Sequence, residues 1–152
     1  MKRIIALCVL LAASLPALAS GPYTVVFKTQ GSFAEVRDNL QMAIENKGLK
    51  ITNTNHIADM LERTGKDIGQ TRVVYENAEQ FEFCSATVSR HMMEADPHAI
   101  VMCPYSIAVY KVPGDANVYM AYRKPPSANR PALKKALTEL EALLQGIIKD
   151  AL

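Results

Sequence analysis

The stretch YSIAVYKVPGDANVYMAY, residues 105–122, decides the fold of this sequence. Both of its ends are rich in β-branched and aromatic residues, which are typical of strands. Pro113-Gly114-Asp115 lies between them, and these residue types favour a turn. The stretch therefore predicts two strands, residues 105–112 and 118–122, that pair in antiparallel fashion.

A helix and a short strand are expected before this hairpin. Apolar residues recur every three or four positions from Phe81 to Ala95, and this spacing predicts a helix over residues 78–94. Asp96-Pro97 ends the helix, because a residue that precedes proline disfavours the helical backbone. The apolar run 99–102 then predicts a buried strand.

Cys84 and Cys103 lie on either side of this predicted reversal. The helix advances about 16 Å from Cys84 to its end at roughly 1.5 Å per residue, and the strand from His98 to Cys103 advances about as far at roughly 3.3 Å per residue. The cysteines would then lie abreast, which predicts a disulfide that closes a loop of about twenty residues and adds roughly 3 kcal/mol of stability. Two buried free thiols are the alternative. A redox-active pair is disfavoured because no Cys-x-x-Cys spacing occurs.

The N-terminal half predicts a strand followed by a capped helix. The β-branched and aromatic run 23–27 is typical of a strand. Ser32 and Glu35 fit a capping box at the start of a helix. That helix has one apolar face and ends before Gly48.

A second strand and helix follow, together with a third strand. Residues 49–51 predict the short second strand. Asn53, Thr54 and Asn55 offer caps for a helix that carries Ile57, Met60 and Leu61 and ends at Gly65. The run 71–75 predicts the third strand.

The last apolar pattern predicts a long amphipathic helix from Pro131 to about Lys149, with the proline in its first turn. Its apolar stripe consists of Leu133, Leu137, Leu140, Leu144 and Ile147. We expect this stripe to lie on the sheet of its own domain, and the alternative is a contact in a homodimer or with a partner. Helices and strands in this order predict an α+β fold, with a mainly antiparallel sheet and helices packed on one face.

Residues 1–19 have the pattern of a signal peptide. Met1-Lys2-Arg3 precedes the apolar run 4–13, and Ala17 and Ala19 occupy the small-residue positions of a cleavage site. The run is shorter than the roughly 20 residues of a membrane span, which disfavours a retained anchor. The sequence therefore predicts cleavage after Ala19, export to the periplasm, one domain over residues 20–152 and no membrane span after cleavage.

Removal of the signal peptide leaves a chain of balanced charge. The whole sequence has 17 Lys and Arg against 15 Asp and Glu, and Lys2 and Arg3 account for the surplus. The remaining basic residues are scattered, so the sequence predicts no nucleic-acid partner. It contains no P-loop, nucleophile elbow, zinc-protease motif or haem-attachment motif. These absences favour a protein that is not an enzyme.

Two sets of side chains are candidates for a binding site. Arg72, Tyr105, Tyr122 and Arg123 lie at or near predicted strand ends, where small ligands often bind, although surface salt bridges are the plainer interpretation.

The second set is His91, Met93 and His98. Imidazole and thioether groups suit Cu(I) and the axial positions of haem. The plainer interpretation is that the histidines are exposed and that the methionines of this region fill gaps in a core.

Several motifs, in this order, resemble one protein family. They are Ser32-Phe33 to Gly48-Leu49, Phe83-Cys84-Ser85-Ala86, Asp96-Pro97, Cys103-Pro104 and Ile107-Ala108-Val109-Tyr110. Together they span residues 23–125 and resemble domain of unknown function family 302. The resemblance implies a compact α+β domain whose topology is similar to that of the TATA-binding protein, and it implies no activity or DNA binding. Where many members have Pro-Cys-Arg, this sequence has Cys103-Pro104-Tyr105-Ser106, and Ser106 stands in place of the arginine.

The sequence as a whole favours a periplasmic module that binds a small ligand or assists another protein. One alternative is a periplasmic copper or haem protein that uses His91 and nearby methionines. Another is an adaptor that contacts a protein partner through the C-terminal helix.

Overall fold

In the part of the chain that the structure describes, six strands form one sheet in the order β1-β2-β6-β5-β4-β3. The structure is a computed structural model that describes residues 19–152, and the predicted signal peptide lies outside the described residues except for Ala19. The strands are β1 (Ala19–Ser20), β2 (Thr24–Thr29), β3 (Ile51–His56), β4 (Asn77–Phe83), β5 (Tyr105–Lys111) and β6 (Val118–Arg123). Every neighbouring pair is antiparallel, which confirms the predicted sheet.

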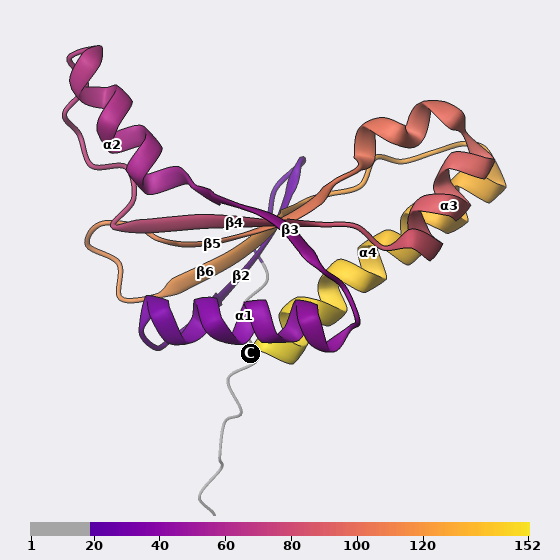
Figure 1. The fold of residues 1–152 in the computed structure, drawn as a ribbon, viewed down its shortest axis with the longest axis horizontal. Coiled ribbons are helices and arrows are strands. Elements are labelled where there is room, and N and C mark those ends of the chain that lie inside the picture. Colours follow the sequence, from indigo (N-terminus) through magenta and orange to yellow (C-terminus); the bar gives the residue numbers. More distant parts are fainter. Residues whose placement is uncertain (1–18) are drawn as a thin grey trace, which may run out of the picture.

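The helices of the described residues are α1 (Phe33–Asn46), α2 (Ile57–Asp67), α3 (Ala86–Ala95), the 3-10 helix η1 (Pro97–Met102) and α4 (Pro131–Ala151). Figure 1 shows α1 and α4 on one side of the sheet, while α2 projects from one end. The helix α3 lies near the opposite end, beside the start of α4 (Figure 1). The α+β fold with a long C-terminal helix is therefore confirmed. Within residues 19–152, no helix combines the length and the apolar character that crossing a membrane requires.

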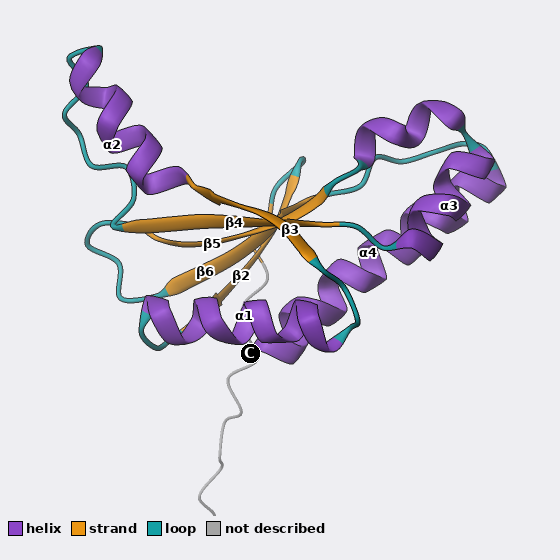
Figure 2. Ribbon diagram, viewed as in Figure 1, coloured by secondary structure: helices purple, strands orange, loops and turns teal. Residues whose placement is uncertain are grey.

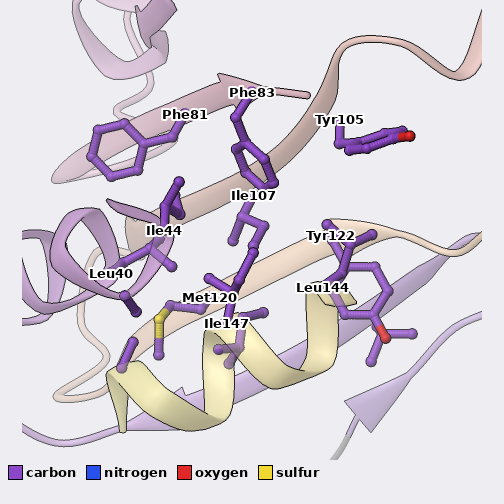
Figure 3. Close-up of a cluster of buried hydrophobic side chains, with 14 of the residues drawn as sticks. Leu40, Ile44, Phe81, Phe83, Tyr105, Ile107, Met120, Tyr122, Leu144 and Ile147 are labelled. Carbon is purple, nitrogen blue, oxygen red and sulfur yellow. The ribbon is translucent and has the colours of Figure 1, made fainter. Parts of the chain in front are cut away.

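The core lies between the sheet and the helices α1 and α4. Figure 3 shows its members from the sheet and from both helices, among them Leu40, Ile44, Phe81, Phe83, Ile107, Met120, Leu144 and Ile147. All of these side chains are buried, and burial of apolar surface is the main favourable term in folding. The apolar stripe of α4 thus faces its own sheet, with only Leu133 partly exposed at its start.

The local signals of the hairpin and of two helix starts are confirmed. Strands β5 and β6 pair as predicted, and Gly114 in their turn has a φ of +79°, a conformation that glycine adopts without strain. Ser32 caps α1 by accepting a hydrogen bond from the backbone N–H of Glu35 at 3.2 Å. Pro131 is the first residue of α4.

The predicted helix over residues 78–94 is wrong in its first half. Residues Asn77–Phe83 form β4, and α3 begins only at Ala86. Phe81 and Phe83 alternate with Glu82 and are buried in the core. The backbone of β4 pairs with β3 on one side and with β5 on the other. These long-range pairs outweigh the helical spacing of the local sequence.

The predicted strand 99–102 is also wrong, because these residues belong to η1. The side chain of Asp96 caps η1 by accepting a hydrogen bond from the backbone N–H of His98 at 3.0 Å. Pro97 occupies its first position, for which its fixed φ is suited. This local capping starts a helical turn where the apolar run alone favours a strand.

The predictions around α2 need three corrections. The second strand runs over Ile51–His56 and overlaps the predicted residues 49–51 at one position only, so the three predicted cap residues lie in β3. The side chain of Asn55 donates to Glu82 of β4 at 2.7 Å, which holds it in the sheet. Gly65 lies inside α2, which continues to Asp67. Residues 71–75 form a loop, because they have no strand beside them in the described part of the chain.

Candidate functional site

The four residues predicted to bind a ligand lie at opposite ends of β4. Arg72 belongs to the loop that leads into the first residue of β4. Tyr105 pairs with Phe83, the last residue of that strand. Tyr105 and Tyr122 are 3 % and 2 % exposed, so both rings belong to the core. The structure therefore groups the two tyrosines with Arg123 and places Arg72 apart from them.

Burial determines the chemistry of the two tyrosines. It raises the pKa of Tyr105 to about 12, and a hydrogen bond with Ser89 offsets part of the rise. It also raises the pKa of Tyr122. The Tyr122 hydroxyl forms no hydrogen bond of normal geometry with any described residue. The nearby Gln145 side chain nevertheless offsets part of the rise in the pKa of Tyr122. Both tyrosines are therefore uncharged at neutral pH.

The cavity beside Tyr105 and Arg123 is small. Its volume is about 40 Å³, and Leu140 and Leu144 of α4 form part of its wall. A cavity of this size holds water but not an organic ligand, since small-molecule sites begin at roughly 300 Å³. Ligand binding by Tyr105, Tyr122 and Arg123 at this end of the sheet stays a prediction.

A larger cavity contains the fourth residue, Arg72. It lies between α2 and residues 70–76 and has a volume of about 290 Å³. Figure 2 shows that α2, drawn in purple, and this loop, drawn in teal, stand away from the body of the sheet. From α2, the lining residues are Ala58, Asp59, Leu61, Glu62 and Lys66. We call α2 and residues 68–76 the arm.

The chain turns back against α2 because residue 65 is a glycine. The backbone N–H of Gln70 donates to the carbonyl of Gly65 at 2.8 Å. A Cβ at position 65 would come within 2.5 Å of the Gln70 carbonyl oxygen, which is closer than real contacts allow. The absence of a side chain at Gly65 therefore places the loop beside the helix and forms the cavity.

Most acidic groups that line the cavity are already paired. Lys66 donates to Glu62 at 2.9 Å, and this hydrogen bond lowers the pKa of the carboxyl group. Lys111 pairs with Glu76 at 3.0 Å and lowers its pKa in the same way. Arg72 forms no ion pair with any described residue. Its guanidinium group is thus available to an anion.

A second group of polar side chains surrounds the two cysteines. Cys84 directly follows β4, and Cys103 lies shortly before β5. The pairing of Phe83 with Tyr105 brings the two segments together, and the two Sγ atoms are 2.7 Å apart. The predicted helix and strand are therefore not what brings the cysteines together, because their proximity comes from the register of β4 and β5. Both side chains are free thiols here, and the disulfide stays a prediction.

Ser89 of α3 connects the thiols to the buried ring of Tyr105. Its hydroxyl lies 3.3 Å from Sγ of Cys103 and 2.7 Å from the hydroxyl of Tyr105. Cys84 is exposed and Cys103 is half-buried. Desolvation of the Cys84 sulfur and its hydrogen bond with Cys103 raise the pKa of Cys84 to about 11. We call Cys84, Ser89, Cys103 and Tyr105 the thiol cluster.

Ser89 is not among the predicted site residues, because the predicted helix begins at residue 78, whereas α3 begins at Ala86. Ser85 caps α3 by accepting a hydrogen bond from the backbone N–H of Val88 at 3.4 Å. Ser89 is four residues later and shares a helix face with it. A helix start at Ser85 is the signal that would have placed Ser89 near Cys84.

The residues predicted to bind copper or haem are spread over three environments. His91 pairs through Nδ1 with Glu139 of α4 at 2.8 Å. Met93 is half-buried, and His98 is exposed at the start of η1. Among the described residues, no group of three or more His, Cys, Asp or Glu could hold a metal ion. A copper or haem site with His91, Met93 and His98 stays a prediction.

Comparison with known proteins places this fold in a family. A model of the family described as "Domain of unknown function DUF302" matches residues 24–151. The crystal structure of the uncharacterized conserved protein DUF302 from Bacillus stearothermophilus is similar, with a TM-score of 0.71 and 14 % sequence identity. The similarity covers 87 % of this chain and 100 % of that one, and at this identity it shows the fold alone. No curated protein matches the chain. Because the family model matches most of its length, the chain belongs to the DUF302 family.

Proposed function

We propose that this chain is an exported module that binds a small anionic ligand in the cavity of the arm. The observation that carries the proposal is the position of Arg72, an exposed guanidinium group in a cavity of about 290 Å³. Arg72 has no ion-pair partner among the described residues. A cavity of this size suits a small molecule of a few tens of atoms at most.

The lining supports a ligand with a carboxylate or phosphate group and a short apolar body. A guanidinium group presents its donors in a planar fork that matches such anions. Leu61, Val73 and Val74 provide apolar surface beside it. Since Glu62 and Glu76 are already paired with lysines, they repel an anion less than free carboxylates would.

Export is supported by the signal-peptide pattern of residues 1–19. Cell fractionation with intact-mass measurement tests it. A periplasmic protein whose mass begins at Ser20 is the expected result. A cytoplasmic protein that retains Met1 or begins at Lys2 would contradict export without affecting the binding proposal.

Ligand binding is tested with the protein purified from its native compartment. Native mass spectrometry should detect a small adduct that denaturation removes. Calorimetric titration with a panel of small carboxylates and organic phosphates should then give a saturable signal for at least one compound. A protein that carries no adduct and binds no member of the panel contradicts the proposal.

The site is tested by Arg72→Ala, with Arg63→Ala as the matched control. Arg63 is exposed on α2, the helix that forms the other side of the cavity, but it does not line the cavity. Because hydrogen bonds to a charged group contribute about 1.5–3 kcal/mol, Arg72→Ala should weaken binding at least tenfold. Arg63→Ala should leave it unchanged. Equal effects of both variants would mean that the ligand binds elsewhere.

A further inference from the structure

We propose that Cys84 and Cys103 form a thiol–disulfide exchange site, in which Cys84 meets an incoming disulfide and Cys103 closes an intrachain bond. This site is separate from the cavity of the arm and does not depend on the proposed function. The site depends on the register of β4 and β5, which brings together two cysteines that are 19 positions apart in the sequence.

The two sulfur atoms are close enough to react with each other. The two Sγ atoms lie 2.7 Å apart without a bond between them. Disulfide formation requires the two Cβ atoms to lie about 3.5–4.5 Å apart, a distance that adjacent sulfur atoms permit. A Cys-x-x-Cys motif brings two cysteines together within one turn of the chain. Here the register of β4 and β5 brings them together instead, so the motif is not required.

The difference in exposure assigns a role to each cysteine. Cys84 is exposed, so a disulfide on another molecule reaches its sulfur first. Cys103 is half-buried and lies against the hydroxyl of Ser89 at 3.3 Å. Ser89 is held in turn by Tyr105 at 2.7 Å. The second sulfur is thus held beside the first, where it attacks the Cys84 sulfur once another thiol group is bound to it.

The exchange balances in two steps. In the first, the Cys84 thiolate attacks a disulfide R–S–S–R′, a Cys84–S–R bond forms, and R′–S⁻ leaves and takes up the proton that Cys84 lost. In the second, the Cys103 thiolate attacks Sγ of Cys84, the bond to S–R breaks, and R–S⁻ leaves as R–SH with the proton of Cys103. Two electrons pass to the incoming disulfide, which is reduced to two thiols, and the cysteines are oxidised to one disulfide.

The raised pKa of Cys84, about 11, affects the rate of the first step. At neutral pH little Cys84 thiolate is present, so the first attack is slow. Because more thiolate forms as the pH rises, the first attack should become faster in alkaline solution.

The closed bond would join the two ends of the segment that contains α3 and η1. That segment packs on α4 and carries Ile100 and Val101, which are 61 % and 80 % exposed. In the chain-entropy model a bond that closes a loop of about twenty residues raises the melting temperature by roughly 10 °C for a domain of this size. Reduction should lower it by the same amount.

The order of attack is tested on the purified, fully reduced chain with oxidised glutathione as the probe. Acid-quenched mass spectrometry should show the wild type lighter by two hydrogens, with no glutathione retained. Cys103→Ser should accumulate one glutathione adduct at Cys84, and Cys84→Ser should form its adduct at least tenfold more slowly. A wild type that carries two glutathiones, or equal adduct rates in the two variants, overturns the proposal.

Two further measurements keep the test decisive. An oxidised dithiol protein replaces glutathione in a second arm. If the Cys84–Cys103 bond forms with the dithiol protein but not with glutathione, the partner is a protein disulfide. If the bond forms with neither oxidant, the proposal is overturned. If a serine variant does not fold, partial alkylation of the reduced wild type with peptide mapping shows which thiol reacts first. Cys84 is the expected result, and prior alkylation of Cys103 overturns the order.

Ser89 is the positioning residue of this site, and its role is tested separately. Ser89→Ala should slow ring closure several-fold, while adduct formation at Cys84 in the Cys103→Ser background stays unchanged. Ser89→Thr keeps the hydroxyl group and should restore the closure rate. If the alanine and threonine variants close at equal rates, the hydroxyl has no positioning role.

Discussion

Helices α4 and α2 are both amphipathic, yet they contribute to the molecule in different ways. Seven residues of α4 are buried, among them Leu140, Leu144 and Ile147. In α2, all of which the structure describes, only Gly65 is buried. The apolar face of α4 is used to stabilise the sheet, whereas the arm leaves Met60, Ile68, Val73 and Val74 exposed. An amphipathic pattern therefore shows that a helix has an apolar face, but not what covers that face.

The largest expected difference between the two helices is the effect of a truncated side chain. Ile147 is 0 % exposed, and Ile147→Ala should lower the free energy of unfolding by about 2–5 kcal/mol through lost burial and a cavity. Leu61→Ala on α2 should cost about 1 kcal/mol or less, because Leu61 is only half-buried. Urea denaturation measures both values. Similar losses would show that the arm supports the fold as much as α4 does.

Replacing glycine by alanine should have opposite effects in the two helices. In α2, the Cβ of Gly65→Ala meets the Gln70 carbonyl at 2.5 Å, and such overpacking costs about 1–3 kcal/mol. In α4, a Cβ at Gly146 meets nothing within 4 Å, so Gly146→Ala should stabilise by about 0.5–1 kcal/mol.

Hydrogen exchange shows whether the strain stays within the arm. The Gln70 amide, which is bonded to Gly65, should exchange roughly tenfold or more faster in Gly65→Ala, while amides of β5 keep their rates. Faster exchange throughout the sheet would mean that the arm and the core unfold together. Ligand binding at the cavity should weaken in the same variant.

Helix caps provide a smaller test of the same comparison. Ser32 caps α1, which lies beside α4, and Ser32→Ala should cost about 1 kcal/mol. His56 precedes α2 and makes no capping hydrogen bond through its side chain, so His56→Ala should cost less than about 0.5 kcal/mol. Thermal unfolding distinguishes the two. An equal loss in both variants would contradict the assignment of Ser32 as the cap.

The smallest expected effect concerns acid stability at the start of α4. Asp96 accepts a hydrogen bond from the His98 backbone and pairs with Arg130, and these interactions lower its pKa below the usual 3.8. A lowered pKa stabilises the fold above pH 3.8, and this contribution is lost as the pH falls through the lowered value. Asp96→Asn should therefore be slightly less stable at neutral pH and lose less stability on acidification. Parallel curves of stability against pH would show that Asp96 contributes nothing.

The elements predicted correctly are those that local chemistry specifies. The turn at Gly114, the cap at Ser32 and the proline at the start of α4 each act within a few residues. The predicted helix over β4 is wrong because the partners of β4, β3 and β5, lie between 22 and 34 residues away along the chain. The apolar spacing from Phe81 onward fits both structures, and only the tertiary pairing decides between them.

The candidate site was predictable only in part, for the same reason. The sequence marks Cys84 and Cys103 by residue type, and oxidation chemistry suggests pairing them. Their proximity depends on the register of β4 and β5. The incorrectly predicted helix over residues 78–94 includes β4, so that register could not be predicted. The sequence predicts one site for Arg72, Tyr105 and Tyr122, because all three lie near predicted strand ends. Which end of the sheet each occupies depends on the order and direction of the strands, which local patterns do not specify.

The pairing of β2 with β6 has a consequence for how the chain acquires its fold. Thr24 lies opposite Arg123, so the sheet joins a strand made early with one made late. The entropy of closing so long a loop is lost before any pairing compensates for it, and such topologies fold slowly. α1 likewise has no helix beside it until α4 has been synthesised. For a chain that we propose is exported, this delay keeps the newly made polypeptide open, in the form that can still be threaded through a membrane channel.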